Sequence, residues 1–219
     1  MGISVSREDY LKTVAEAEAE GETATASALA RRLDVSIPAV SMALKRLRRD
    51  GMVELDGGGV IRLTDPGREV AERLLRRHFL LERMLTEMFD FEWYKVHDEA
   101  ERLEHAISDD FERKLRDRLG DADLCPHGNS PGGDSPESRR DRGWLPLPEC
   151  PVGSRARIRS VFERDRALLE HLDQLRLRPG TALTVRSHNW DDTFTLSVDG
   201  ADAVLGLRAA ELVWVEVVK

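Results

Sequence analysis

The chain of 219 residues is poor in cysteine, in aromatic residues and in long hydrophobic runs, and each shortage excludes a class of protein. Its two cysteines, Cys125 and Cys150, lie in proline-containing sequence and are too few for a disulfide-stabilised secreted scaffold. No hydrophobic run approaches the roughly 20 residues that cross a bilayer, and the N-terminus lacks the layout of a signal peptide. We therefore expect a cytoplasmic protein with no membrane partner.

The charge of the chain is unevenly distributed. A net charge of −8 argues against indiscriminate binding of nucleic acid by the whole protein. Residues 25–49 nevertheless carry one acid, Asp34, against six cations: Arg31, Arg32, Lys45, Arg46, Arg48 and Arg49. A basic segment on an acidic protein indicates a local nucleic-acid-binding element.

The same segment has the pattern of a helix-turn-helix. A first helix follows Ser6, a suitable N-cap, and two short helices follow over about 26–33 and 37–49. Ser36 is placed to cap the third helix, with Pro38 in its first turn and Gly51 at its end. The sequence M-V-E-L-D-G-G-G-V-I-R-L then alternates about a glycine turn, which predicts a two-stranded wing. Residues 1–65 are thus predicted to form a winged helix-turn-helix; the alternative is a helical bundle with an incidental hairpin.

The solvent side of the third helix supplies the candidate DNA contacts. Six residues there are predicted to approach base edges and thymine methyl groups: Ser36, Pro38, Ala39, Ser41, Met42 and Lys45. The arginines are better suited to phosphates, which set register and affinity rather than sequence choice: Arg46, Arg48, Arg49 and the wing's Arg62.

Histidine and glutamate recur at helical spacing in the middle of the chain. A long helix is expected after Thr64 and a second from about Trp93 to Leu119. The first carries His78 and Glu82 four residues apart, and the second carries a run that one helical stripe would align: His97, Glu101, Glu104 and His105. Imidazole and carboxylate together suit a divalent first-row metal, whereas the alternative is a solvated acidic face.

The aromatic sequence F-D-F-E-W-Y between these two helices is of a kind that often packs at interfaces. A winged helix that binds an operator usually pairs with itself, since two-fold symmetry matches a palindromic site. Residues 66–124 are therefore predicted to form a domain for dimerisation and metal sensing.

The last part of the chain changes in composition. Residues 125–150 are rich in proline, glycine and charge and are predicted to be a loosely ordered linker. Cys125 and His127 could be a further ligand pair, but the lack of nearby partners in sequence favours a structural role. Residues 151–219 alternate as several short strands around one helix, which predicts a small SH3-like β-barrel. The fold class is mainly α with small β parts.

A winged helix followed by H-x-x-x-E, then K-V-H-D-E-A-E-R-L-E-H-A-I-S-D and P-H-G-N-S-P-G, resembles the diphtheria-toxin-repressor family of iron- and manganese-dependent repressors. The resemblance covers the whole chain, since the three-domain members end in an SH3-like (FeoA-like) domain. It implies a primary metal site of Asp9, Glu101, Glu104 and His105. It also implies an ancillary site of His78, Glu82 and His97, joined by Asp165 from the last domain.

The resemblance also bears on the metal. Iron-sensing members carry sulfur ligands where this chain has Asp9 and Glu101, and carboxylates harden a site toward Mn²⁺, with Fe²⁺ as the alternative. In the branch with paired manganese ions a glutamate stands three positions after the aspartate, where this chain has Lys12, so that geometry is in doubt. We expect two ions per subunit.

The implied function is a homodimeric, metal-activated regulator that binds a palindromic operator and represses genes of metal uptake. Without metal, the negative charges of Asp9, Glu101 and Glu104 would repel one another and leave the first helix loosely attached. Two other classes stay open: a di-metal enzyme, although no catalytic residues are identified, and a DNA-binding protein that responds to an organic ligand.

Overall fold

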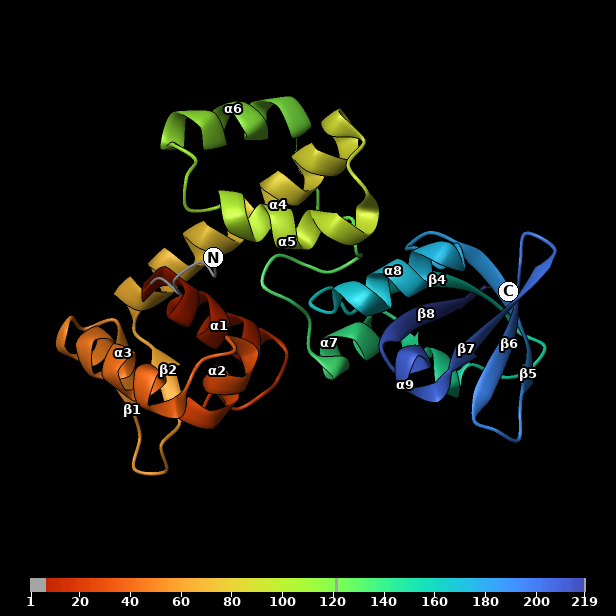
Figure 1. Cartoon of the computed structure of the whole chain (residues 1–219), viewed down its shortest axis with the longest axis horizontal. Helices are drawn as coiled ribbons and strands as arrows, with labels where there is room; N and C mark the ends of the chain where they lie inside the picture. The colour runs from red at the N-terminus through yellow and green to blue at the C-terminus, as the bar shows by residue number, and fades with distance from the viewer. Residues whose placement is uncertain (1–6, 121, 219) are drawn as a thin grey trace.

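The computed structural model describes residues 7–120 and 122–218, which form three bodies (Figure 1). The winged helix lies at one end, a helical domain stands above it, and a β-sheet domain lies at the other end. The Ser6 cap falls outside the described residues. The expected class, a winged helix and a helical domain followed by an SH3-like β domain, is confirmed.

The first body is a winged helix-turn-helix. Its elements are α1 (Arg7–Ala19), α2 (Ala26–Arg32), α3 (Ile37–Arg49), β1 (Val53–Leu55) and β2 (Ile61–Leu63). Ser36 caps α3 by accepting a hydrogen bond from the Ala39 amide, and β1 pairs antiparallel with β2 through Glu54 and Arg62. The buried residues of the three helices and the wing form one core, which α4 completes with Ala71 and Leu75.

The helical domain consists of α4 (Asp65–Phe89), the 3-10 turn η1 (Trp93–Lys95), α5 (Val96–Leu103) and α6 (Asp109–Leu119). Thr64 caps α4 as predicted. The second helix was expected to run unbroken to Leu119, and this prediction is wrong. The chain turns after Leu103, and Ser108 starts a new helix by accepting a hydrogen bond from the Phe111 amide. Glu104 and His105 therefore lie in the turn after α5.

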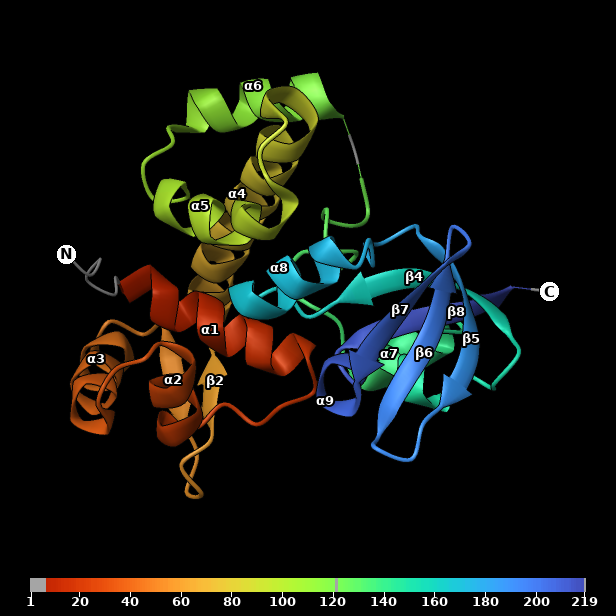
Figure 2. The same cartoon turned by 45° about the vertical axis from the view of Figure 1, so that its right-hand side comes forward.

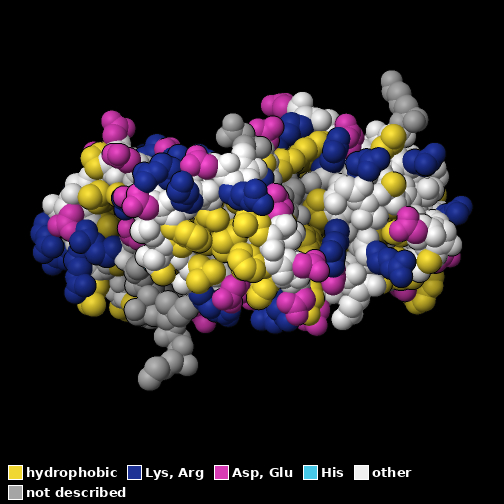
Figure 3. Space-filling view, turned by 90° about the horizontal axis from the view of Figure 1, so that it is seen from above, with side chains coloured by type: hydrophobic (Ala, Val, Ile, Leu, Met, Phe, Trp, Pro, Cys, Tyr) yellow, Lys and Arg dark blue, Asp and Glu magenta, His cyan; other side chains and the backbone are white. Residues whose placement is uncertain are grey.

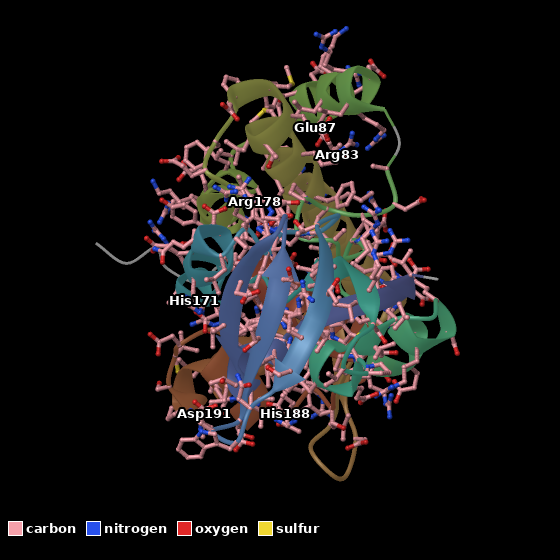
Figure 4. The ribbon with its side chains drawn as sticks, turned by 90° about the vertical axis from the view of Figure 1, so that its right-hand side faces the viewer. Arg83, Glu87, His171, Arg178, His188 and Asp191 are labelled. Atoms are coloured by element: carbon pink, nitrogen blue, oxygen red, sulfur yellow. The ribbon has the colours of Figure 1, made fainter. Side chains whose placement is uncertain are left out.

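The α6 helix is fastened to α4 at its C-terminal end. The Arg83 guanidinium donates to the carbonyls of Leu119 and Gly120 at 2.8 Å each, and its Nε donates to Glu87 at 2.8 Å. Figure 4 shows Arg83 and Glu87 together in the upper, helical part of the molecule. The cation thus satisfies carbonyls that the helix end leaves unpaired.

The third body is a six-stranded antiparallel sheet in the order β3-β8-β4-β5-β6-β7. The strands are β3 (Leu145–Pro146), β4 (Arg155–Val161), β5 (Ala182–His188), β6 (Thr193–Val198), β7 (Ala201–Gly206) and β8 (Val213–Val218). The accompanying helices are α8 (Arg166–Gln174) and α9 (Leu207–Ala210), with the 3-10 turn η2 (Leu147–Glu149). Alternating residues of β4, β5 and β6 face one buried core.

Residues 125–150 do not form the loosely ordered linker that their composition predicts. They contain α7 (Pro136–Asp141), β3 and η2, and they bury His127, Asn129 and Asp134. The prediction of a loosely ordered linker is wrong because glycines and polar side chains of this segment pack against the rest of the protein. At Gly128 φ is +83°, and a Cβ would lie 1.9 Å from the carbonyl oxygen of Arg159. Only glycine allows this loop to lie against β4.

The sheet domain contacts both other bodies (Figure 2). Trp93 of η1 is buried in the core of the sheet domain and donates from Nε1 to the Pro126 carbonyl at 2.9 Å. Arg164, just before α8, donates to Glu20 just after α1 at 2.6 Å. Within the described residues, no helix is both long and hydrophobic enough to cross a membrane.

Candidate metal centre and DNA-binding face

The predicted DNA-contacting residues lie on α3, at its N-cap and on strand β2 of the wing. All are exposed except Ala39, which is half-buried: Ser36, Pro38, Ser41, Met42, Lys45, Arg46, Arg48, Arg49 and Arg62. Met42 is 60% exposed and Ile37 53%, so α3 presents two hydrophobic side chains to solvent. An open groove between α3 and the wing is lined in part by Lys45, Arg48 and Arg49. This face offers hydrophobic groups flanked by cations.

Three groups of potential metal ligands lie around α4 and α5, and in each the ligand atoms are within 4.8 Å of one another. We name them the junction group (Asp9, Glu104, His105), the inner group (His78, Glu82, His97) and the cysteine group (Glu82, Cys125, His127, Glu163).

The junction group joins α1 to the end of α5. His105 Nε2 lies 2.7 Å from Asp9 Oδ1 and 3.9 Å from Glu104 Oε1, while its Nδ1 lies 2.9 Å from Glu8 Oε2. Burial opposes protonation of His105, but hydrogen bonds to Glu8 and Asp9 outweigh burial and raise its pKa. Glu101, also expected here, is half exposed, and its Oε1 lies 3.8 Å from both Lys12 Nζ and His97 Nε2. It borders the group without joining it.

The inner group is buried between α4 and α5. Glu82 Oε1 lies 3.2 Å from His78 Nε2 and 3.1 Å from His97 Nδ1, and the two imidazole nitrogens are 3.1 Å apart. Burial and the Lys12 charge oppose protonation of His78, yet Glu82 and Glu104 raise its pKa to about 9. The resemblance to the repressor family implied this set, whereas helical spacing alone placed His97 with Glu101, Glu104 and His105.

The cysteine group extends the inner group toward the sheet domain. His127 Nδ1 lies 3.4 Å from Glu82 Oε1 and 3.5 Å from Glu163 Oε2. Cys125 Sγ donates to Glu163 Oε2 at 3.1 Å, and Asn129 Nδ2 donates to the same oxygen at 2.8 Å. Glu82 therefore serves two groups, with histidine nitrogens on both sides.

His127 carries the clearest sign that something is to be bound. Its Nε2 lies 3.2 Å from the Trp93 carbonyl, which leaves Nδ1 as the unprotonated nitrogen of a neutral ring. In that tautomer the buried Nδ1 faces two acceptors, Glu82 Oε1 at 3.4 Å and Glu163 Oε2 at 3.5 Å, and receives no hydrogen bond. In the protonated ring the carboxylates take over: burial opposes the charge, but Glu82 and Glu163 raise the pKa of His127 to about 10. A cation or a proton is needed here.

Asp165, expected as the ligand from the last domain, caps a helix instead. Its Oδ1 accepts from the Leu168 amide at 3.0 Å and so caps α8. Glu163, two residues earlier, is the acid that faces the cysteine group. This geometry makes Glu163 a better candidate ligand from the last domain than Asp165. Glu163, Cys125 and His127 were the ligand candidates that sequence reasoning missed or set aside. Their only local signal was Cys-Pro-His-Gly.

Lys12 also changes the expected electrostatics. Its Nζ donates to Glu104 Oε1 and Oε2 at 2.9 and 3.0 Å and lies 3.8 Å from Glu101 Oε1. Burial opposes ionisation of Glu104, but His78 and Lys12 outweigh it and lower its pKa. The expected repulsion among Asp9, Glu101 and Glu104 is thus already reduced by a lysine on α1.

The donor sets fit a divalent cation. Two ligands at about 2.1 Å from one metal, at octahedral or tetrahedral angles, lie roughly 3 to 3.5 Å apart. The distances within the inner group and around His127 fall in this range. Carboxylate and imidazole are ligands of Mn²⁺ and Fe²⁺, and a thiolate adds a softer donor.

The helical domain also presents hydrophobic side chains to solvent. Met88 and Phe89 of α4 are 48% and 64% exposed, and Phe111 of α6 is 44% exposed. Seen from above, hydrophobic side chains gather over this part of the molecule (Figure 3). The F-D-F-E-W-Y stretch was expected at an interface as a whole, but Phe89 is the one exposed side chain among its aromatic residues. Trp93 is buried in the core of the sheet domain, and Phe91 packs in the helical domain.

The sequence matches three protein-family domains in order. Residues 3–59 match the iron dependent repressor N-terminal DNA binding domain, and residues 64–131 match its metal binding and dimerisation domain. Residues 145–217 match the FeoA domain.

Known proteins resemble the chain over most of its length. The iron-dependent repressor IdeR of Mycobacterium tuberculosis is 36% identical over 191 residues, which are 82% of this chain and 83% of that protein. The diphtheria toxin repressor of Corynebacterium glutamicum is 34% identical over 187 residues, 81% of this chain and 82% of the relative. A manganese-dependent transcriptional repressor solved with manganese superposes with a TM-score of 0.81 at 29% identity, covering 97% of this chain and all of that chain. The manganese regulator SloR gives 0.74 at 27% identity, covering 99% of this chain and all of that one.

Proposed function

The chain belongs to the diphtheria toxin repressor and IdeR family of metal-dependent, DNA-binding transcriptional repressors, and from this premise we propose that Mn²⁺ activates it to repress genes of metal uptake. Membership in this family excludes the alternative of a di-metal enzyme, because the family consists of transcriptional repressors. The observation that carries the proposal is the convergence of carboxylates and imidazoles from α1, α4, α5 and the sheet domain on the three ligand groups.

We assign two ions to each subunit. The junction group, with Glu101 at its edge, would hold one ion through Asp9, Glu104 and His105. The second ion would lie about Glu82, which faces His78 and His97 on one side and His127 and Glu163 on the other. The buried Nδ1 of His127, which faces the carboxylates of Glu82 and Glu163 and receives no hydrogen bond in the neutral ring, supports its place among these ligands.

The choice of Mn²⁺ rests on ligand chemistry. The junction group offers two carboxylates and one imidazole and no sulfur, a hard set of the kind that Mn²⁺ accepts. Relatives divide on the metal: several sequence relatives are named as iron-dependent repressors, and several structural relatives as manganese regulators. Fe²⁺ is the alternative activator, since it accepts the same ligands.

We propose that metal acts on DNA binding through α1. Asp9 lies on α1, which packs against α2, α3 and α4, whereas Glu104 and His105 belong to the helical domain. The positive charge of a bound divalent cation would allow the carboxylates of Asp9 and Glu104 to lie close together. Asp9 and His105 then hold α1 at a fixed position relative to the dimer, and α3 follows. Ligand binding favours this arrangement only by its difference in affinity between the two states.

The test is a fluorescence-anisotropy titration of full-length protein on a palindromic operator fragment at matched free Mn²⁺, Fe²⁺, Co²⁺ and Zn²⁺. We expect binding to require metal, to be strongest with Mn²⁺, and to disappear on addition of chelator. Preference for Fe²⁺ at matched concentration would make the alternative correct. Equal binding with and without metal would refute metal activation and favour the organic-ligand alternative.

Glu104→Gln provides the matched variant, because it keeps the size of the side chain and removes its charge. It should raise the Mn²⁺ concentration needed for half-maximal operator binding by roughly 10-fold or more. Glu211→Gln makes the same change at an exposed position in the sheet domain and should leave the titration unchanged.

A further inference from the structure

Lys12 is a buried cation in the middle of the metal-binding region. It lies on α1 with only 5% of the residue exposed. Its Nζ is 2.9 and 3.0 Å from the two oxygens of Glu104, 3.3 Å from His78 Nδ1 and 3.8 Å from Glu101 Oε1. Two carboxylates and one imidazole thus surround a single ammonium group.

The ammonium stays charged at this position. A buried lysine without partners would lose its proton, because burial penalises the charged form. Lys12 does have partners, since its Nζ donates to both carboxylate oxygens of Glu104 at 2.9 and 3.0 Å. The contacts with Glu104 lie at normal hydrogen-bond distances, so the lysine remains a fixed positive charge.

The position of the ammonium lies between two of the ligand groups. Glu104 faces His105 of the junction group with Oε1, at 3.9 Å, and His78 of the inner group with Oε2, at 2.6 Å. An ion bridging Glu104 and His78 would occupy the space that the Lys12 Nζ fills. It would also place two more positive charges next to the one already present.

We propose that Lys12 takes the place of a second divalent cation at the contact of α1 with α5, so that the junction group binds one ion and never a pair. The inference rests on the proposed function and concerns how many ions the site admits. Lys12 is in this sense a residue that determines metal stoichiometry, and it holds Glu104 toward α1.

Two substitutions of Lys12 test whether its positive charge excludes a second ion. Lys12→Gln removes the cation, and Lys12→Glu replaces it by a further potential ligand. Lys114→Glu makes the same charge change at an exposed position on α6 and is the control. The measurement is the number of Mn²⁺ bound per subunit by equilibrium dialysis of full-length protein. Electron paramagnetic resonance on the same samples reports whether two ions are coupled.

We expect two uncoupled Mn²⁺ per subunit in the wild type and in Lys114→Glu. Lys12→Glu should bind one more ion, with a spectrum of two coupled ions, and Lys12→Gln should bind the added ion more weakly. If Lys12→Glu does not fold, as judged by circular dichroism, Lys12→Gln carries the test. A coupled pair in the wild type, or unchanged stoichiometry in the folded Lys12 variants, would overturn the role of Lys12 while leaving metal activation intact. A wild type that binds no Mn²⁺ would overturn both.

Discussion

A single residue, Gly128, allows the loop that holds Cys125 and His127 to turn back toward the ligand groups. The loop that holds them turns back at Gly128, the amide of which donates to the Cys125 carbonyl at 2.9 Å. In the same loop the amide of Val161 on β4 donates to the His127 carbonyl at 3.0 Å. Backbone hydrogen bonds therefore position His127, and the pattern of side chains in the sequence does not predict them.

Gly128→Ala should destabilise the metal-free protein by about 2–4 kcal/mol, because the added Cβ meets the Arg159 carbonyl at 1.9 Å in a left-handed conformation. Gly143→Ala is the matched control: φ is +80° there, but the Cβ would meet nothing within 4 Å. It should cost only about 1–2 kcal/mol for the backbone conformation. Chemical denaturation with chelator measures both. Equal losses would show that the close approach at Gly128 has no energetic weight.

Among the helices and strands, the features that the sequence predicts are those that depend on residues close to one another in the chain. Ser36 and Thr64 cap α3 and α4 where expected, because an N-cap uses an amide three residues away. His78 and Glu82 lie at helical spacing, but the resemblance to the repressor family, and not the spacing, assigned them to one site with His97. The break after α5 was missed, because the pattern of His97, Glu101, Glu104 and His105 continues a helical stripe across it. Glu163 was missed, and Cys125 and His127 were considered but set aside, because these residues meet only after the sheet domain packs on α4.

The α8 helix offers a test at this scale, since a cap and a candidate ligand stand two residues apart. Asp165→Ala should lower stability by about 1 kcal/mol through loss of the N-cap, with Mn²⁺ binding unchanged. Glu163→Ala should weaken binding of the second ion by roughly 10-fold or more. Thermal unfolding with chelator and isothermal titration with Mn²⁺ measure the two effects. Weakened Mn²⁺ binding in Asp165→Ala would restore the assignment that the capping geometry replaces.

At the scale of the whole molecule, the three bodies are tied together at the ligand groups. The junction group joins the winged helix to the helical domain, and the cysteine group joins α4 to the sheet domain. Arg164 follows Glu163 directly and reaches Glu20 after α1 at 2.6 Å, so the sheet domain also contacts the DNA-binding body. Ion binding is therefore expected to change how the domains are held together more than it changes any single domain.

The proposed palindromic operator would require two such molecules, and we expect them to meet at the exposed hydrophobic side chains of the helical domain. Phe89 is 64% exposed, which a soluble monomer has little reason to maintain beside Met88 and Phe111. Phe89→Asp should weaken dimerisation by roughly 30-fold or more, since a buried aromatic anchor contributes about 2 kcal/mol or more to an interface. Trp190→Asp is the control, because Trp190 is 97% exposed and lies in the sheet domain. Sedimentation velocity over a concentration series, with Mn²⁺ present, compares the two. Dissociation by Trp190→Asp with an intact Phe89→Asp dimer would move the interface to the sheet domain and break the link between the helical domain and operator symmetry.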